Sequence, residues 1–509
     1  MPTAAENNKR IAKNTLILYG RMLIMALVGL YTSRVVLNAL GVVNYGIYNA
    51  VGGFVAMFFL LSGVLTNSIN RFLTFELGRG DMDKLKRVFC TALNVMGLLS
   101  CLIFVLGATV GVWFLNTQMN IPADRMVAAN VVLACSIFTF ILGLICMPYN
   151  AAIIAHEKMS VFARLTILDV LIKLLVAYLL TVSPIDVLIF YALLLLSISI
   201  LMRFIYAIYS KRHFEECTYH FIVDKPLLKE MTSFAGWNFL AAGAGLINIH
   251  GVNVMMNLFF GVAINAARGV ANQVNAHVAM FVGNFMTAMN PQITKSYAQG
   301  DYTYMHSLIC RGAKFSFFLV YFFMLPLCLE THQVLHLWLG IIPEHAVPFV
   351  QLTLAATALN VLSGPLITGL HATGNIKRYM IIVGAVEITN FPITYIVFKL
   401  GGTPQSAYYV YLVIYFILML LRLFLIKDLI HMKASMFVRK VYVPVLVVSV
   451  LSCIFPVLIF LPQEENLIRF ISVFLVSFAS TAVCVYFVGL EVNERSMIVK
   501  LINNKLHRN

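Results

Sequence analysis

The chain has 509 residues, of which 61% are hydrophobic and only 11% are charged, and its formal net charge is +15. Soluble domains contain roughly 25% charged residues, so the composition excludes an ordinary water-soluble fold and predicts a membrane protein. Positive charge in a soluble chain would suggest nucleic-acid binding. Here the Lys and Arg residues fall mainly in short connections between apolar segments, and we expect no nucleic-acid partner.

Apolar segments of about 20 residues, long enough to cross about 30 Å of hydrocarbon, recur from Thr15 almost to the C-terminus. They predict an all-α polytopic protein with about 14 transmembrane helices. The first six lie near Thr15–Leu37, Tyr45–Leu65, Val88–Leu115, Val127–Tyr149, Val161–Thr181 and Val187–Tyr209. The next six lie near Met231–His250, Ile264–Met289, Phe315–Val334, Ala346–Leu370, Tyr379–Leu400 and Tyr408–Ile426, and the last two near Val441–Leu461 and Leu467–Val488.

Alternate connections between these segments are rich in Lys and Arg. They include Lys9–Lys13, Arg71–Arg87, Lys158, Lys211–Lys229, Lys295–Lys314, Lys377–Arg378, Lys427–Lys440 and the tail from Arg495. Intervening connections such as Ala39–Tyr45 and Pro462–Asn466 are short and poor in both residues. By the positive-inside rule, we expect a multi-pass protein of the bacterial inner membrane with both termini in the cytoplasm and no sizeable periplasmic domain. The first segment carries Arg21 and no clear cleavage site, so we interpret it as an uncleaved span.

The sequence carries an internal repeat. A shift of about 220 residues aligns Gly41-Val42 with Gly261-Val262 and Gly80-Asp81 with Gly300-Asp301. With a slightly smaller shift, the segment ending Ala155–Lys158 aligns with the one ending Ala372–Asn375. We therefore predict two six-helix bundles related by pseudo-twofold symmetry, residues 1–210 and 211–432, followed by two additional helices and a cytoplasmic tail in residues 433–509. This organisation is typical of alternating-access transporters with a site between the halves.

Ionisable residues within the spans are the candidate functional groups, because a charge at the bilayer centre costs at least roughly 2.5 kcal/mol unless it is paired or hydrated. They are Arg21, Arg34, Asp169, Lys173 and Arg203 in the first half, and His250, Arg268 and Glu387 in the second. Arg21 and Arg268 lie too deep for easy snorkelling to the headgroups, so we expect them to face a water-filled cavity. Arginine binds phosphate oxygens through two donors at once, which favours an anionic cargo such as a pyrophosphate headgroup.

Several of these residues have a structural alternative. Asp169 and Lys173 are four residues apart on one helical face and can neutralise each other. Asp169, His250 and Glu387 are candidates for ion coupling, but His250 and Glu387 equally suit hydrogen bonding between helices. Arg203 lies near the end of its span and suits a structural, snorkelling role.

Motifs that would indicate chemistry are missing from the sequence. It contains no P-loop, no HExxH and no nucleophile elbow, and its nine cysteines are scattered without a CxxC pair. We therefore expect a protein that is not an enzyme and has no catalytic residues, metal site or cofactor.

Two parts of the sequence resemble a known family. Asn14–Ala50, with Arg34 and Gly41–Tyr48 (GVVNYGIY), looks like the start of bacterial polysaccharide flippases of the multidrug/oligosaccharidyl-lipid/polysaccharide exporter superfamily. The segments Asn257–Gly261 (NLFFG), Asn265–Gly269 (NAARG) and Asn290–Ile293 (NPQI) resemble the seventh and eighth spans of the O-antigen and capsule flippases.

The resemblance implies a V-shaped pair of bundles around a cationic cavity. It implies that the protein is a flippase that moves undecaprenyl-pyrophosphate-linked oligosaccharide, as in lipopolysaccharide synthesis, across the inner membrane, coupled to an ion gradient. Arg21, Arg34, Lys173 and Arg268 are then the predicted substrate-binding residues. The expected partners are the lipid-linked oligosaccharide and membrane lipids, with polysaccharide-assembly proteins as further candidates, and we expect the monomer to be functional.

Two other functions compete with this prediction. A multidrug or cation antiporter of the same superfamily would favour carboxylates in the membrane for its cationic drugs, whereas this chain has more Arg and Lys than Asp and Glu there. A membrane-embedded polysaccharide polymerase or ligase would be expected to carry a large periplasmic loop, and the short outer connections argue against it.

Overall fold

The structure is a computed structural model that describes residues 4–496, apart from 57, 118–120, 223, 247, 249–250, 462–463 and 493. It divides into two compact units. Unit 1 comprises Met1–Phe239 and Thr294–Gly300, and unit 2 comprises Leu240–Ile293 and Asp301–Asn509. Throughout the described residues the regular elements are helices, which confirms the all-α prediction.

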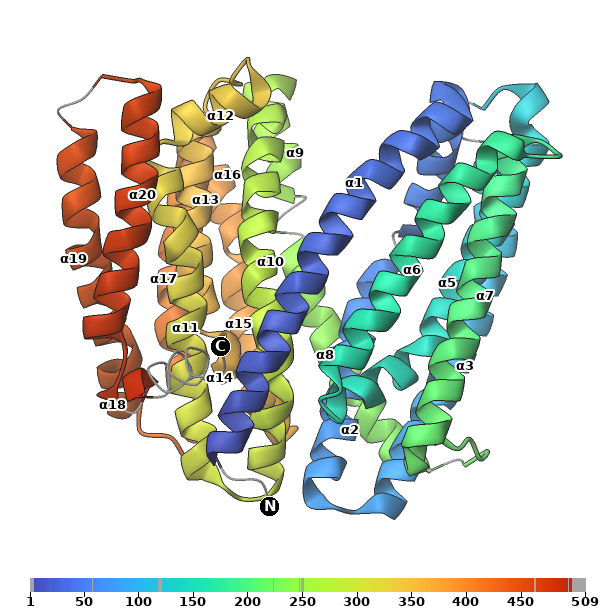
Figure 1. Ribbon diagram of the computed structural model, residues 1–509, viewed down its shortest axis with the longest axis horizontal. Coiled ribbons are helices and arrows are strands. Elements are labelled where there is room, and N and C mark those ends of the chain that lie inside the picture. Colours follow the sequence, from blue (N-terminus) through green and yellow to red (C-terminus); the bar gives the residue numbers. More distant parts are fainter. Residues whose placement is uncertain are drawn as a thin grey trace, which may run out of the picture. The chain divides into compact units, whose positions relative to one another are not determined.

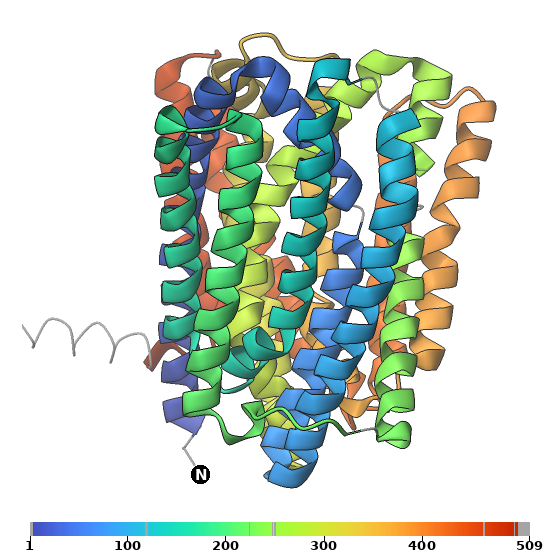
Figure 2. The ribbon, with the colours of Figure 1, turned by 90° about the vertical axis from the view of Figure 1, so that its right-hand side faces the viewer.

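The long helices of unit 1 run roughly along one direction (Figure 2). They are α1 (Ala4–Ala56), α2 (Phe59–Arg79), α3 (Met82–Leu106), α5 (Met126–Ala155), α6 (Met159–Leu179), α7 (Val187–His213) and the greater part of α8 (Lys225–Leu246). The short helix α4 (Val112–Thr117) extends α3 through a π-helical turn, η1 (Gly107–Gly111). Three 3₁₀ turns, η2 (Ala123–Arg125), η3 (Leu180–Val182) and η4 (Glu215–Cys217), lie in the connections. α5 packs most extensively against α7, and α1 against α6.

Unit 2 contains shorter and more broken helices. They are α9 (Val252–Phe260), α10 (Val262–Ala298), α11 (Tyr302–Leu329), α12 (Thr331–Leu339), α13 (Ala346–Val361), α14 (Gly364–Thr373), α15 (Lys377–Ile388), α16 (Asn390–Lys399) and α17 (Ser406–Ile426). They continue with α18 (Ala434–Phe437), η6 (Val438–Tyr442), α19 (Val443–Phe460), α20 (Leu467–Cys484) and η7 (Val485–Gly489). The hairpin of α19 and α20 packs against α11 (Figure 1).

Eleven helices of the described chain are long and apolar enough to cross a membrane, so the protein is a multi-pass membrane protein. The predicted second, seventh and eighth spans are not among these eleven. The reason is clearest in α10, whose sequence includes Asn275, Asn284 and Asn290 and is therefore less apolar than a lipid-facing helix. Asn275 and Asn290 accept hydrogen bonds from Thr357 (2.6 Å) and Thr368 (2.9 Å) within unit 2. Polar side chains of this kind face protein rather than lipid.

The internal repeat is visible in the backbone. Gly41 and Gly261 have φ values of 74° and 83°, and Gly80 and Gly300 have 76° and 75°. These are left-handed conformations that glycine adopts without a steric penalty. Asp81 and Asp301, one residue further on, cap the next helix by accepting a backbone hydrogen bond, at 2.9 Å from Lys84 and 3.0 Å from Tyr304.

Several helices extend past the ends of the predicted spans. The expected connection at Ala39–Tyr45 coincides with Gly41, whose backbone is not helical and where two helices meet at a kink within α1. α2 extends to Arg79, so Arg71, which we expected in a connection, lies inside a helix and is 7% exposed. Its guanidinium lies over the rings of Phe72 and Phe234, at 4.4 and 5.5 Å. Lys295 and Lys314 likewise lie within α10 and α11. A search for apolar windows does not detect these helical turns, because a helix can continue beyond the residues that cross the hydrocarbon.

Candidate functional site

The charged residues predicted in unit 1 lie on α1, α6 and α7. Arg21 of α1 extends across to α6, where its guanidinium carbon is 4.8 Å from the centre of the Phe162 ring. On α6, Lys173 Nζ is 2.7 Å from Asp169 Oδ2, as the four-residue spacing predicts. Asp169 is thus an ion-paired carboxylate, and its predicted role in ion coupling stays a prediction.

Arg203 of α7 contacts an aromatic side chain of α5. Its guanidinium carbon lies 4.3 Å from the centre of the Tyr149 ring, and its Nη2 donates a 3.4 Å hydrogen bond to the Tyr149 hydroxyl oxygen. A guanidinium held over a ring face gains roughly 1 to 2 kcal/mol where it is desolvated. Arg203 is thus a half-buried cation in contact with an aromatic ring of the same unit, and its predicted snorkelling role stays a prediction.

A cavity of about 530 Å³ lies within unit 1. Its wall comes from α1, α2, α5, α6 and α7, and Asp169 is the ionisable acid in this lining. Most of the polar groups there are uncharged hydroxyls and amides, among them Ser62, Thr66, Ser136, Thr139, Asn150, Thr166, Ser199 and Tyr206. The volume lies in the range typical of small-molecule sites. Groups of this kind both donate and accept hydrogen bonds, as sugar hydroxyls do.

Arg268 is the predicted substrate-binding residue of unit 2. It lies on α10 and is half-buried, and its Nη1 is 3.1 Å from Met256 Sδ of α9. Its guanidinium carbon lies 5.8 Å from the centre of the Tyr408 ring on α17. A thioether is a weak acceptor, whereas a guanidinium makes stronger, charge-assisted hydrogen bonds to anionic oxygens.

Glu387 of α15 belongs to a polar network inside unit 2. Arg422 of α17 donates to Glu387 Oε1 at 2.8 Å and to Asn360 Oδ1 at 2.6 Å. Asn248 donates to the Glu387 backbone oxygen at 2.9 Å and accepts a hydrogen bond from Asn390. The ion pair is nearly inaccessible, with Arg422 6% and Glu387 14% exposed in their side chains. Glu387 therefore has the interhelical bonding of the structural alternative, and a coupling role stays a prediction.

We did not predict Arg422, Asn248, Asn360 or Asn390 from the sequence. The signal for Arg422 was present, because a charged residue flanked by leucines lies inside the predicted span Tyr408–Ile426. The three asparagines carried no such signal, since single amides are common in membrane helices. The predicted residues Arg34 and His250 cannot be assigned contacts, because the Arg34 side chain and all of His250 lie outside the described residues.

A second buried ionic cluster joins three segments of unit 1. Glu157, between α5 and α6, accepts from Arg10 Nε of α1 at 2.7 Å and from Lys295 Nζ of α10 at 2.8 Å. Asn14 donates to the Glu157 backbone oxygen at 3.3 Å. The Glu157 side chain is 1% exposed, and its φ of 58° is unusual for a residue other than glycine. The same position in the second repeat is Gly374, whose φ is 76°.

The end of α10, from Thr294, belongs to unit 1 and packs tightly within it. α10 passes from unit 2 into unit 1 at Thr294. A Cβ added to Gly78 of α2 would lie 3.0 Å from the Lys295 Cα, so glycine is what allows this approach. Phe75 and Tyr297 pack beside it, with ring centres 6.4 Å apart. The carboxylate of Glu157 therefore anchors the end of α10 within unit 1.

Comparison with known proteins yields structural neighbours alone. No protein-family model and no curated protein sequence matches the chain. A point mutant of MATE superposes with a TM-score of 0.70 at 13% identity, covering 84% of this chain and 96% of that one.

Two further structures match over a similar length. A MOP superfamily transporter from Pyrococcus furiosus, described as having a binding pocket of reverse polarity that suggests a different function, superposes with a TM-score of 0.67 at 14% identity, covering 84% of this chain and 96% of that one. A multidrug resistance MATE family transporter of the MOP superfamily, in an outward-facing conformation, gives 0.68 at 13% identity, covering 83% and 96%. The chain therefore shares the multi-pass, all-helical fold of these MATE and MOP superfamily structures.

Proposed function

We propose that this protein is a transporter rather than an enzyme, that it works by alternating access, and that it flips undecaprenyl-pyrophosphate-linked oligosaccharide across the bacterial inner membrane. The observation that carries the proposal is the sign of the charge inside the predicted spans. The cations there outnumber the carboxylates Asp169, Glu330 and Glu387, and they are Arg21, Arg34, Arg164, Lys173, Arg203, Arg268, Lys399, Arg422 and Arg469. The surplus is positive whichever groups pair with one another.

The carboxylates within the predicted spans are already paired with cations. Asp169, Glu330 and Glu387 each bind a cation from the same unit, Lys173, Arg469 and Arg422 respectively. None of the three carboxylates is therefore an isolated negative charge of the kind that would attract a cationic drug. A buried positive surplus is costly unless an anion offsets it, and a pyrophosphate group carries the matching charge.

The cavity of unit 1 supports the glycan part of the cargo. Its lining is mainly apolar, and the hydroxyl groups and the Asn150 amide set within it can hydrogen-bond sugar hydroxyls without requiring one fixed arrangement. In the proposed mechanism Arg21 of unit 1 and Arg268 of unit 2 are each contacts for headgroup phosphates, the cavity of about 530 Å³ in unit 1 holds sugar units, and the lipid tail stays in the bilayer. Protonation of Asp169 or Glu387 would release its cation, which is how an ion gradient would be coupled to the cycle.

The proposal is tested with purified protein in proteoliposomes. We expect protein-dependent transfer of a labelled undecaprenyl-pyrophosphate-linked oligosaccharide between leaflets, read by its accessibility to an external reagent, with and without a proton or sodium gradient. Arg268→Ala and Arg21→Ala should each lower the rate about tenfold or more, because a desolvated charge-assisted contact contributes about 1.5 to 3 kcal/mol. Arg164→Gln removes an exposed cation of α6 and is the matched control.

The alternative outcomes are distinct. Unchanged transfer in the combined Arg21 and Arg268 variant would refute the headgroup assignment. No lipid transfer, together with gradient-driven uptake of a cationic drug in the same vesicles, would establish the multidrug antiporter instead. The proposed topology, with both termini in the cytoplasm and a functional monomer, is checked separately by labelling terminal tags in intact cells and by the mass of the purified protein.

A further inference from the structure

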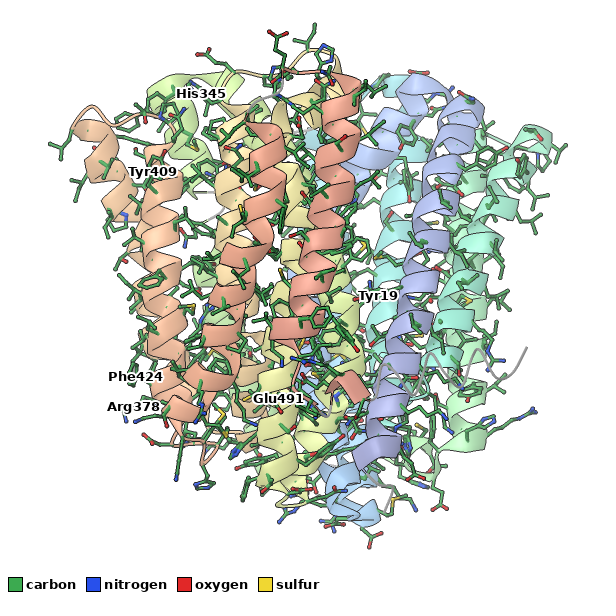
Figure 3. The ribbon with its side chains drawn as sticks, turned by 60° about the vertical axis from the view of Figure 1, so that its left-hand side comes forward. Tyr19, His345, Arg378, Tyr409, Phe424 and Glu491 are labelled. Atoms are coloured by element: carbon green, nitrogen blue, oxygen red, sulfur yellow. The ribbon has the colours of Figure 1, made fainter. Side chains whose placement is uncertain are left out.

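A second cavity, of about 600 Å³, lies within unit 2 at one end of the hairpin formed by α19 and α20. Its wall contains Lys314 of α11, Arg439 and Lys440 of η6, and Gly489 and Glu491 at and after η7. Figure 3 places Glu491 at the same end of unit 2 as Arg378 and at the opposite end from His345. The site is separate from Arg268 and from the Glu387–Arg422 network.

The charge of this cavity is positive. Glu494 is held by two cations, Lys314 Nζ at 2.8 Å and Arg311 Nε at 3.2 Å. Glu491 is paired with Lys440 Nζ at 3.2 Å. Arg439 is exposed and adds a further cation to the lining. The lining itself thus contains three cations, Lys314, Arg439 and Lys440, and one carboxylate, Glu491, and together with the neighbouring Arg311 and Glu494 the surplus remains positive and suits an anion.

The backbone around the cavity is specialised. Both flanking segments, η6 and η7, are π-helical turns, which are rare and occur frequently at functional sites. A Cβ on Gly489 would lie 2.8 Å from the Phe318 ring of α11, so glycine lets η7 approach α11 closely. Lys314 is only 3% exposed, which shows that this charge is built into the wall and is not a mobile surface lysine.

The surface next to the cavity is apolar and exposed. Val443 and Leu446 of α19 are 50% and 66% exposed, and Phe487 of η7 is 62% exposed. In a membrane protein such side chains contact acyl chains. A free phosphate would use the cations alone, whereas a phospholipid would use the cations and this apolar surface together.

We propose that this cavity binds the phosphate headgroup of an anionic phospholipid, with its acyl chains lying along α19 and η7. Arg439 and Lys440 contact the phosphate oxygens. The buried ammonium group of Lys314, in the wall of the cavity, adds electrostatic attraction. The bound lipid links η6, η7 and α11, and therefore stabilises the attachment of the C-terminal hairpin to the rest of unit 2. This site goes beyond the proposed transport function and does not depend on it.

The test uses the full-length protein, delipidated in a neutral detergent. Phosphatidylglycerol, phosphatidylcholine and inorganic phosphate are each titrated, with bound lipid counted by native mass spectrometry and stability followed by thermal unfolding. We expect phosphatidylglycerol alone to bind and to raise the unfolding temperature. Each basic residue near the membrane surface contributes about a fivefold change in affinity, so Arg439→Gln with Lys440→Gln should weaken binding roughly 25-fold. Arg378→Gln removes a cation at the same end, outside this cavity, and should leave binding unchanged.

Each contrary outcome overturns the proposal. Equal binding of phosphatidylcholine would remove the role of the negative charge. A full effect from inorganic phosphate would show a free anion site and no lipid site. Equal loss of binding in Arg378→Gln would show attraction to general surface charge. If the double variant does not fold, the single variant Arg439→Gln replaces it, because Arg439 is exposed and its loss should not affect folding. We expect Arg439→Gln to weaken lipid binding about fivefold. Unchanged affinity would refute the site.

Discussion

Replacing Glu157 with Gln tests the ionic cluster at the end of α10. The carboxylate is 1% exposed and binds two cations of unequal burial, Lys295 with 18% and Arg10 with 41% of the side chain exposed. Removing one partner of a buried ion pair costs about 3 to 5 kcal/mol, because the other charge is left desolvated. An exposed pair contributes about 0 to 1 kcal/mol. We therefore expect Glu157→Gln to cost about 3 to 5 kcal/mol, and Arg10→Gln less than about 1 kcal/mol.

The measurement is the free energy of reversible unfolding in mixed micelles of SDS and a mild detergent. The double variant Glu157→Gln with Lys295→Met removes both buried charges, and its cost should be smaller than the sum of the two single changes by about 1 kcal/mol or more. Equal costs for Glu157→Gln and Arg10→Gln, or strictly additive effects of Glu157 and Lys295, would refute the reasoning that burial of Lys295 dominates the cluster.

Three further predictions follow from the geometry. Arg422→Met leaves the Glu387 carboxylate buried without its cation and should cost about 3 kcal/mol or more in the same unfolding assay, whereas Arg422→Met with Glu387→Gln should recover most of that loss; a double variant as unstable as the single one would contradict this. Gly300→Ala places a Cβ at a φ of 75° and should cost about 1 to 2 kcal/mol, against no comparable loss for Gly283→Ala, which lies in open space within α10. Burial raises the pKa of the Cys217 thiol, and Glu216 beside it adds to the effect, so a single-cysteine variant should resist maleimide at pH 8 when folded and react in SDS; rapid labelling of the folded protein would show that this thiol is accessible.

The sequence by itself determined that the protein lies in a membrane rather than in water, and it determined where most of the helices lie along the chain. A helix in hydrocarbon must satisfy its own backbone hydrogen bonds and cover its length with apolar side chains, so this information is local and readable from windows of about 20 residues. The pairing of Asp169 with Lys173 and the repeat marked by Gly41, Gly80 and their counterparts are equally local, because they depend on spacing along one helix or on one residue's φ.

Only the tertiary structure decided which charges meet. Glu387 and Arg422 are 35 residues apart, and Glu157 and Lys295 are 138 apart, so no periodicity in the sequence relates them. The same holds for the two cavities, whose walls combine side chains from several helices. The physical reason is that a buried ion is stabilised by partners within a few ångströms in space, and the packing of helices, rather than their order in the chain, sets those distances.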